Sequence, residues 1–75
     1  MQNRPIAVVR RDIIASTAPS IYGIQRMEKV RSPKGEIFAF LGVCDGVAHV
    51  EREDKTKGSP FEEVDSEDFS KWRKA

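Results

Sequence analysis

The chain has 75 residues, of which 39% are hydrophobic and 33% charged, and its formal net charge is +1. This composition is typical of a small globular domain and excludes a disordered chain. A single cysteine excludes an intrachain disulfide framework, and no apolar run approaches the ~20 residues of a membrane-spanning helix. We therefore expect residues 1–75 to form one domain with no membrane association. We expect it in the cytoplasm, because residues 1–5 lack the apolar core of a secretory signal.

The charges are divided unevenly along the chain. Residues 1–35 contain seven basic and two acidic side chains, a net charge of +5, whereas residues 36–75 contain six basic and ten acidic ones, a net charge of −4. Such a division arises from a basic binding face, or from basic and acidic edges that pair within the fold. We favour pairing, because the imbalance is small beside that of nucleic-acid-binding domains.

The first third of the chain predicts two strands. Residues 5–10 are short, β-branched and preceded by proline, which favours a first strand at a sheet edge. Residues 12–17 either continue that strand or form one helical turn that ends before Pro19. Residues 22–30 show partial alternation of apolar and polar side chains, which predicts a half-exposed strand.

The central segment is the clearest signal in the chain. Residues 37–44 form a continuous apolar run, which predicts a strand covered on both faces. The dipeptide Asp45-Gly46 predicts a tight hairpin turn to a second strand over residues 47–52. Gly42 inside the run predicts a bulge or sharp bend. Successive side chains of a strand lie on opposite faces. We expect Ile37, Ala39, Leu41 and Val43 to pack against the core, and Phe38 and Phe40 to be largely covered from the other side.

The last third predicts a loop, a strand and a helix. Residues 53–59 are charged and lack apolar anchors, so we expect a mobile loop, and residues 61–64 a short closing strand. Asp65 is a candidate N-cap, and basic side chains at positions 71, 73 and 74 would then fill the last helical turn. An alternative helix begins at the capping-box sequence of residues 59–62. Phe69 and Trp72 would lie on one helical face and bury at least part of the indole.

These elements predict a mainly β or α+β fold, a small bent antiparallel sheet with a short C-terminal helix. A closed or nearly closed SH3-like barrel is our first expectation, because closure removes exposed sheet edges. The alternative is an open α+β sheet with one or two helices on one face.

The sequence predicts no catalytic, cofactor-binding or metal-binding residues. Cys44 and His49 lie five residues apart, but Cys44 sits in the most apolar segment, where we expect a buried thiol with little reactivity. One cysteine and one histidine cannot fill a tetrahedral zinc site. The glycines form neither a dinucleotide-binding motif nor a phosphate-binding loop.

We therefore expect a non-enzymatic binding or regulatory module that acts through a protein partner and uses no cofactor. The alternative is a nucleic-acid-binding module that uses the basic N-terminal half. In either case the candidate contact residues are Arg10, Arg11, Tyr22, Arg26, Lys29, Arg31 and Lys34. A homodimer is also expected, because a small domain gains from pairing its sheet edges, here at residues 6–10 or 22–30.

Residues 15–23, Ala-Ser-Thr-Ala-Pro-Ser-Ile-Tyr-Gly, resemble the segment that opens the ATPase domain of minichromosome maintenance helicases. In that family an acidic helix and then a phosphate-binding loop would follow. Residues 24–27 depart from the expected continuation, and no phosphate-binding loop follows. The resemblance covers nine of 75 residues and implies no ATPase activity.

Overall fold

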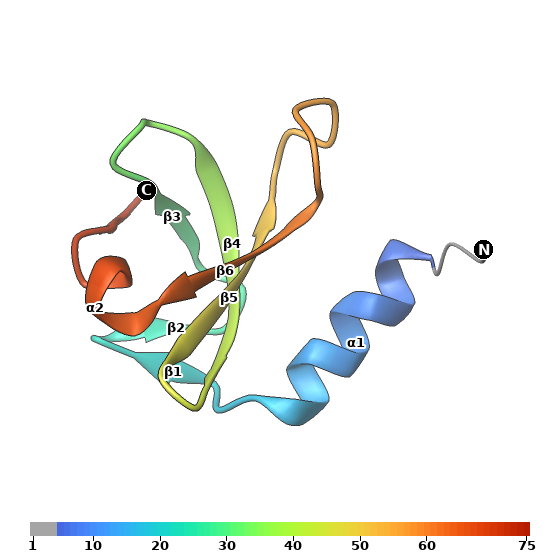
Figure 1. The fold of residues 1–75 in the computed structure, drawn as a ribbon, viewed down its shortest axis with the longest axis horizontal. Helices are drawn as coiled ribbons and strands as arrows, with labels where there is room; N and C mark the ends of the chain where they lie inside the picture. Colours follow the sequence, from blue (N-terminus) through green and yellow to red (C-terminus); the bar gives the residue numbers. More distant parts are fainter. Residues whose placement is uncertain (1–4) are drawn as a thin grey trace.

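The structure is a computed structural model that describes residues 5–75, so the expectation about residues 1–5 falls mostly outside it. Five strands form an antiparallel sheet in the order β6-β5-β4-β3-β7, and two short strands form a separate β1-β2 hairpin (Figure 1). The elements in chain order are α1 (Ile6–Ser16), β1 (Ser20–Ile21), β2 (Ile24–Gln25), β3 (Lys29–Arg31), β4 (Ile37–Cys44), β5 (Val47–Arg52), β6 (Phe61–Asp65), α2 (Ser66–Phe69) and β7 (Arg73–Lys74).

The mainly β fold is confirmed, but the barrel is not. Strand β6 pairs only with β5, and β7 pairs only with β3, so the sheet keeps two edges and is not closed. No helix within residues 5–75 has both the length and the apolar character that crossing a membrane requires.

The central hairpin is confirmed. Strands β4 and β5 pair up to Cys44 opposite Val47, and both turn residues adopt positive φ, 51° at Asp45 and 75° at Gly46. A two-residue turn with this geometry matches the twist of the flanking strands. The sequence therefore predicted both the position and the type of this turn.

The predicted irregularity at Gly42 is also confirmed. The β4–β5 register shifts between Phe40 and Gly42, which is a β-bulge. The segment that follows α1 crosses β4 here, and the Ala18 and Val43 backbones exchange two hydrogen bonds of 2.8 and 3.0 Å. A Cβ at Gly42 would lie 1.9 Å from Thr17 Oγ1, so only glycine permits this approach.

The prediction that Ala39 and Leu41 face the core, with Phe38 and Phe40 on the other side of β4, was wrong. Phe38 and Phe40 face the main core, whose other buried members are Ile24, Val30, Ala48, Val50 and Phe69. Ala39 and Leu41 are buried outside this cluster, whereas Val43 packs against it, as expected. The rings of Phe38 and Phe40 fill the space beneath the bent sheet. Because the bulge after Phe40 inserts an extra residue, the alternation of side chains between the two faces is inverted beyond it.

The prediction of a first strand over residues 5–10 was wrong, because residues 6–10 belong to α1 and Pro5 stands at its N-cap. The helix also absorbs residues 12–17 up to Ser16, and Thr17 returns to an extended conformation before Pro19. Ile6, Val9 and Ile13 are spaced as on one helical face, so helical periodicity outweighs β-branched propensity. Figure 1 shows α1 extending away from the sheet, and none of its residues is buried.

The single strand predicted over residues 22–30 was also wrong. Tyr22 and Gly23 turn the β1-β2 hairpin with φ of 54° and 76°, and Met27 has φ of 73°. These left-handed conformations interrupt any extended segment. Strand β3 begins only at Lys29, and because it lies between β4 and β7 it is not an edge. The edge proposed for a homodimer at residues 6–10 therefore does not exist, and residues 22–30 contain only the two-residue strand β2 and the start of β3.

The C-terminal segment confirms the cap but not the long helix. The Asp65 side chain accepts a hydrogen bond of 2.9 Å from the Glu67 N–H, so the helix does not begin at residues 59–62. Helix α2 ends at Phe69, and residues 73–74 pair with β3 instead of forming a last helical turn. Trp72 is half-buried as expected, with ring centroids 5.2 Å from Phe38 and 5.3 Å from Phe69.

Candidate basic interface on strands β3 and β7

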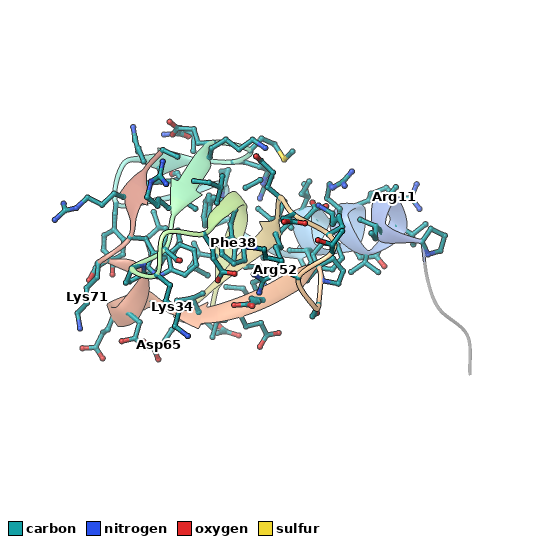
Figure 2. The ribbon with its side chains drawn as sticks, turned by 90° about the horizontal axis from the view of Figure 1, so that it is seen from above. Arg11, Lys34, Phe38, Arg52, Asp65 and Lys71 are labelled. Atoms are coloured by element: carbon teal, nitrogen blue, oxygen red, sulfur yellow. The ribbon has the colours of Figure 1, made fainter. Side chains whose placement is uncertain are left out.

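The structure divides the predicted contact residues among three places. Arg10 and Arg11 lie on α1, Tyr22 and Arg26 belong to the β1-β2 region, and Lys29, Arg31 and Lys34 lie on β3 and the turn that follows it. Figure 2 shows Arg11 at one end of the molecule and Lys71 at the other. The basic N-terminal half is therefore not one surface.

Arg10 forms an ion pair within the fold. Its guanidinium donates to both carboxylate oxygens of Glu51, at 2.6 and 2.7 Å, and Lys55 Nζ lies 3.2 Å from the same carboxylate. The hydrogen bonds from Arg10 hold the pKa of Glu51 below its ordinary value and raise that of Arg10. Because Glu51 is 5% exposed, this bidentate pair fixes α1 to the outer face of the sheet.

Arg26 is also engaged by the fold. Its Nε donates to the Leu41 carbonyl at 2.6 Å, and Nη2 donates to the Thr17 carbonyl at 2.7 Å. These bonds satisfy carbonyl groups where the chain leaves α1 and crosses the bulge. A partner would have to displace them, so we exclude Arg26 from the interface.

Tyr22 is exposed but anchored at its hydroxyl, which donates to the Ser66 carbonyl at 2.9 Å. The bond ties the β1-β2 turn to the start of α2. Tyr22 as a whole is 56% exposed, and its ring has no cation partner that the structure describes.

Two arginines that form no salt bridge within residues 5–75 lie on the paired strands β3 and β7. Arg31 lies directly opposite Arg73 in the antiparallel β3–β7 pair. Within residues 5–75 neither guanidinium forms a salt bridge, and Arg31 contacts only the Gly35 carbonyl, at 3.5 Å. Like charges directly opposite each other destabilise a sheet, so this Arg31–Arg73 pair is an unfavourable element that the fold retains.

Further basic side chains surround the Arg31–Arg73 pair. Lys29 Nζ pairs with Glu53 at 2.6 Å, and Lys74 Nζ lies 3.6 Å from Glu28. Lys34 and Lys71 form no salt bridge in the described part of the chain, and both are labelled in Figure 2. We call Lys29, Arg31, Lys71, Arg73 and Lys74 the basic edge.

Sequence reasoning missed three of the five residues of this basic edge. Positions 71, 73 and 74 were assigned to the last turn of a helix, where they would have complemented its dipole. Nothing local in this segment distinguishes a frayed helix end from a two-residue strand. The pairing of β7 with β3 is a long-range contact, and it brings together cations more than 40 positions apart.

A cavity of about 320 Å³ lies beside this edge, lined by Lys34, Phe38, Arg52 and Trp72 among others. Arg52 is buried there, donates to Glu36 at 2.5 Å and to Glu62, and stacks 4.9 Å above the Phe38 ring (Figure 2). Its charge is thus neutralised by two carboxylates. Lys34 is the cation at this cavity that has no such partner within residues 5–75.

The Cys44 prediction was wrong, because the thiol is exposed at the end of β4. Cys44 lies opposite Val47, whereas His49 lies opposite Gly42, so the two side chains are not cross-strand neighbours. His49 Nδ1 is instead 4.0 Å from Glu63 Oε2. Among residues 5–75 no three His, Cys, Asp or Glu side chains are grouped as metal ligands.

No protein-family model, curated protein or solved structure matches this chain.

Proposed function

We propose that this chain is a non-enzymatic binding module, and that its basic edge recognises an acidic segment of a protein partner. The Arg31–Arg73 pair carries the proposal. Two arginines at opposite register positions, neither with a carboxylate partner within residues 5–75, offer a site for carboxylates, which bind guanidinium donors in bidentate fashion. A bound acidic group would relieve the like-charge repulsion that the free chain retains.

The charges around the basic edge favour an acidic peptide over a nucleic acid. Glu53 and Glu28 already neutralise Lys29 and Lys74, and Glu67 and Asp68 of α2 lie four and three positions before Lys71. A phosphate backbone needs a long, continuous basic track, and these carboxylates would repel it. A short acidic segment needs only the Arg31–Arg73 pair and its immediate neighbours.

The proposal places the module in the cytoplasm as a regulatory or adaptor domain. The exposed, unpaired thiol of Cys44 fits a reducing compartment better than an oxidising one.

Fluorescence anisotropy with a labelled oligoglutamate peptide tests the proposal. We expect binding that weakens steeply with salt and is lost in the double variant Arg31→Gln/Arg73→Gln. Hydrogen bonds to charged groups contribute about 1.5–3 kcal/mol each, so each arginine should change affinity by about tenfold or more. The matched control is Arg11→Gln, because Arg11 is exposed and forms no salt bridge within the described residues.

The same assay with a single-stranded oligonucleotide of equal charge tests the nucleic-acid alternative. Tighter binding of the oligonucleotide than of the peptide, lost in the same double variant, would replace the acidic partner with a nucleic acid. No peptide binding at low salt, or equal losses in Arg11→Gln and the double variant, would contradict the proposed site.

A further inference from the structure

The two open edges of the sheet carry opposite charges. Edge strand β7 presents Arg73 and Lys74, whereas edge strand β6 presents Glu63 and Asp65, both exposed. Edges with like charge repel each other, which protects a sheet from pairing with an identical edge. Opposite edges have no such protection, because β6 of one copy attracts β7 of another.

On β6, some backbone groups point away from β5 and have no partner within residues 5–75. The Arg52 N–H donates to the Pro60 carbonyl at 2.6 Å, and the Ser66 N–H donates to the Gly46 carbonyl at 2.8 Å. In an antiparallel ladder, residues that bond the neighbouring strand alternate with residues whose N–H and C=O point outward. The backbone groups of Glu63 and Asp65 therefore face the open edge.

The same alternation applies to β7. The Ala75 N–H donates to the Lys29 carbonyl at 3.0 Å, so Arg73 bonds β3 and the Lys74 backbone faces outward. This edge is only two residues long, so any strand added to it gains few backbone bonds, and side-chain charge must supply most of the attraction.

On the two edges, the side chains of Glu63, Asp65 and Arg73 lie on the same face of the sheet, whereas Lys74, opposite Val30, lies on the other face. Phe61, Glu51, Ala39 and Lys29 stand opposite one another across four strands, so they share a face. On β6, the side chains of Glu63 and Asp65 lie on the same face as that of Phe61. On β3, Arg31 shares the face of Lys29, and it lies opposite Arg73. A second copy that continued the sheet in the same orientation would place Glu63 or Asp65 beside Arg73.

We propose that β6 of a second copy is an acidic segment that the basic edge binds, so that the chain self-associates head to tail. This inference rests on the proposed function, since the Arg31–Arg73 pair supplies the attraction. The contact is heterologous, because different edges meet, and it leaves one free edge at each end of a chain of copies. Such an assembly is open-ended and weak, and it depends on salt.

Charge exchange between the edges tests the inference by sedimentation velocity. The wild-type chain should gain weight-average mass with concentration at about 0.01 M ionic strength, where the Debye length is about 30 Å, and should be monomeric at about 1 M, where it is about 3 Å. Arg73→Glu and Glu63→Arg should each abolish association, because each places like charges where Arg73 and Glu63 would meet. An equimolar mixture of the two variants should associate again, and Lys57→Glu is the control for net charge.

The outcomes separate this inference from the proposed function. A wild-type chain that stays monomeric at low salt but binds oligoglutamate would overturn self-association alone. Association that survives both variants, or a mixture that stays monomeric, would also overturn it. Glu63→Arg should keep its affinity for oligoglutamate, whereas Arg73→Glu should lose it. Failure of both peptide binding and self-association would contradict both proposals.

Discussion

Gly42 is the residue where the sheet and the segment after α1 approach most closely. Its missing side chain leaves room for Thr17, whose Cβ would lie 2.4 Å from a Cβ at position 42. We predict that Gly42→Ala lowers the free energy of unfolding by about 1–3 kcal/mol, since this overlap forces the crossing segment outward. Urea unfolding followed by Trp72 fluorescence measures the loss.

A second substitution separates this overlap from other effects of alanine. In a Thr17→Gly background the nearest overlapping atoms are gone, so adding Gly42→Ala should cost clearly less than in the wild-type chain. Equal costs in both backgrounds would show that the contact with Thr17 does not make glycine necessary.

Arg73 should lower the stability of the fold although it contributes to binding. Replacing it with glutamate exchanges a like-charge cross-strand pair with Arg31 for an opposite-charge pair, which is worth about 0.2–1 kcal/mol. We therefore predict that Arg73→Glu raises the melting temperature while acidic-peptide binding is lost. Lys57→Glu, an equal charge change in the loop before β6, should not raise it; a lower melting temperature for Arg73→Glu would contradict the prediction.

Among the elements, α1 depends most on a single ion pair. The pKa of Glu51 is lowered from its ordinary value of 4.5, first by the Arg10 hydrogen bond and then by Lys55. A carboxyl with a lowered folded-state pKa stabilises the fold above its ordinary pKa, and this contribution is lost as pH falls through the lowered value. We predict that acidification below about pH 4 loosens α1 on the sheet.

Hydrogen exchange and unfolding at several pH values check this prediction. The variant Glu51→Gln should be less stable than the wild-type chain near neutral pH, and its stability should change less between pH 7 and 3. Amides of Ile6–Ser16 should exchange faster in the variant. A variant with the same pH dependence as the wild-type chain would show that Glu51 does not anchor the helix.

The elements also show how far the sequence predicts the structure. Local signals were sufficient for the β4-β5 hairpin, the bulge at Gly42, the Asp65 cap and strand β6. They failed for α1, where β-branched residues suggested a strand, and for β7, whose pairing with β3 no local pattern encodes. The candidate interface failed for the same reason, because three of its five cations, Lys71, Arg73 and Lys74, reach it only through that pairing.

At the scale of the whole molecule, stability rests on β4, which is covered on both faces. Leu41 is fully buried on the strand that joins the core to the α1 side. We predict that Leu41→Ala lowers the free energy of unfolding by about 2–5 kcal/mol, a large part of what a domain of this size has. Ile37→Ala, at a half-buried position on the same strand, should cost less; a Leu41→Ala loss below that of Ile37→Ala would contradict this account.

The central claim is that the whole chain presents one anion-binding surface, on β3 and β7. Backbone amide chemical shifts recorded during titration with the oligoglutamate peptide test it most directly, because they locate the contact without a substitution. We predict salt-sensitive shifts at Lys29–Arg31 and Arg73–Lys74, with the amides of Ile6–Ser16 unchanged. Shifts confined to α1 or to the loop at residues 53–60, or no shifts at low ionic strength, would contradict the claim.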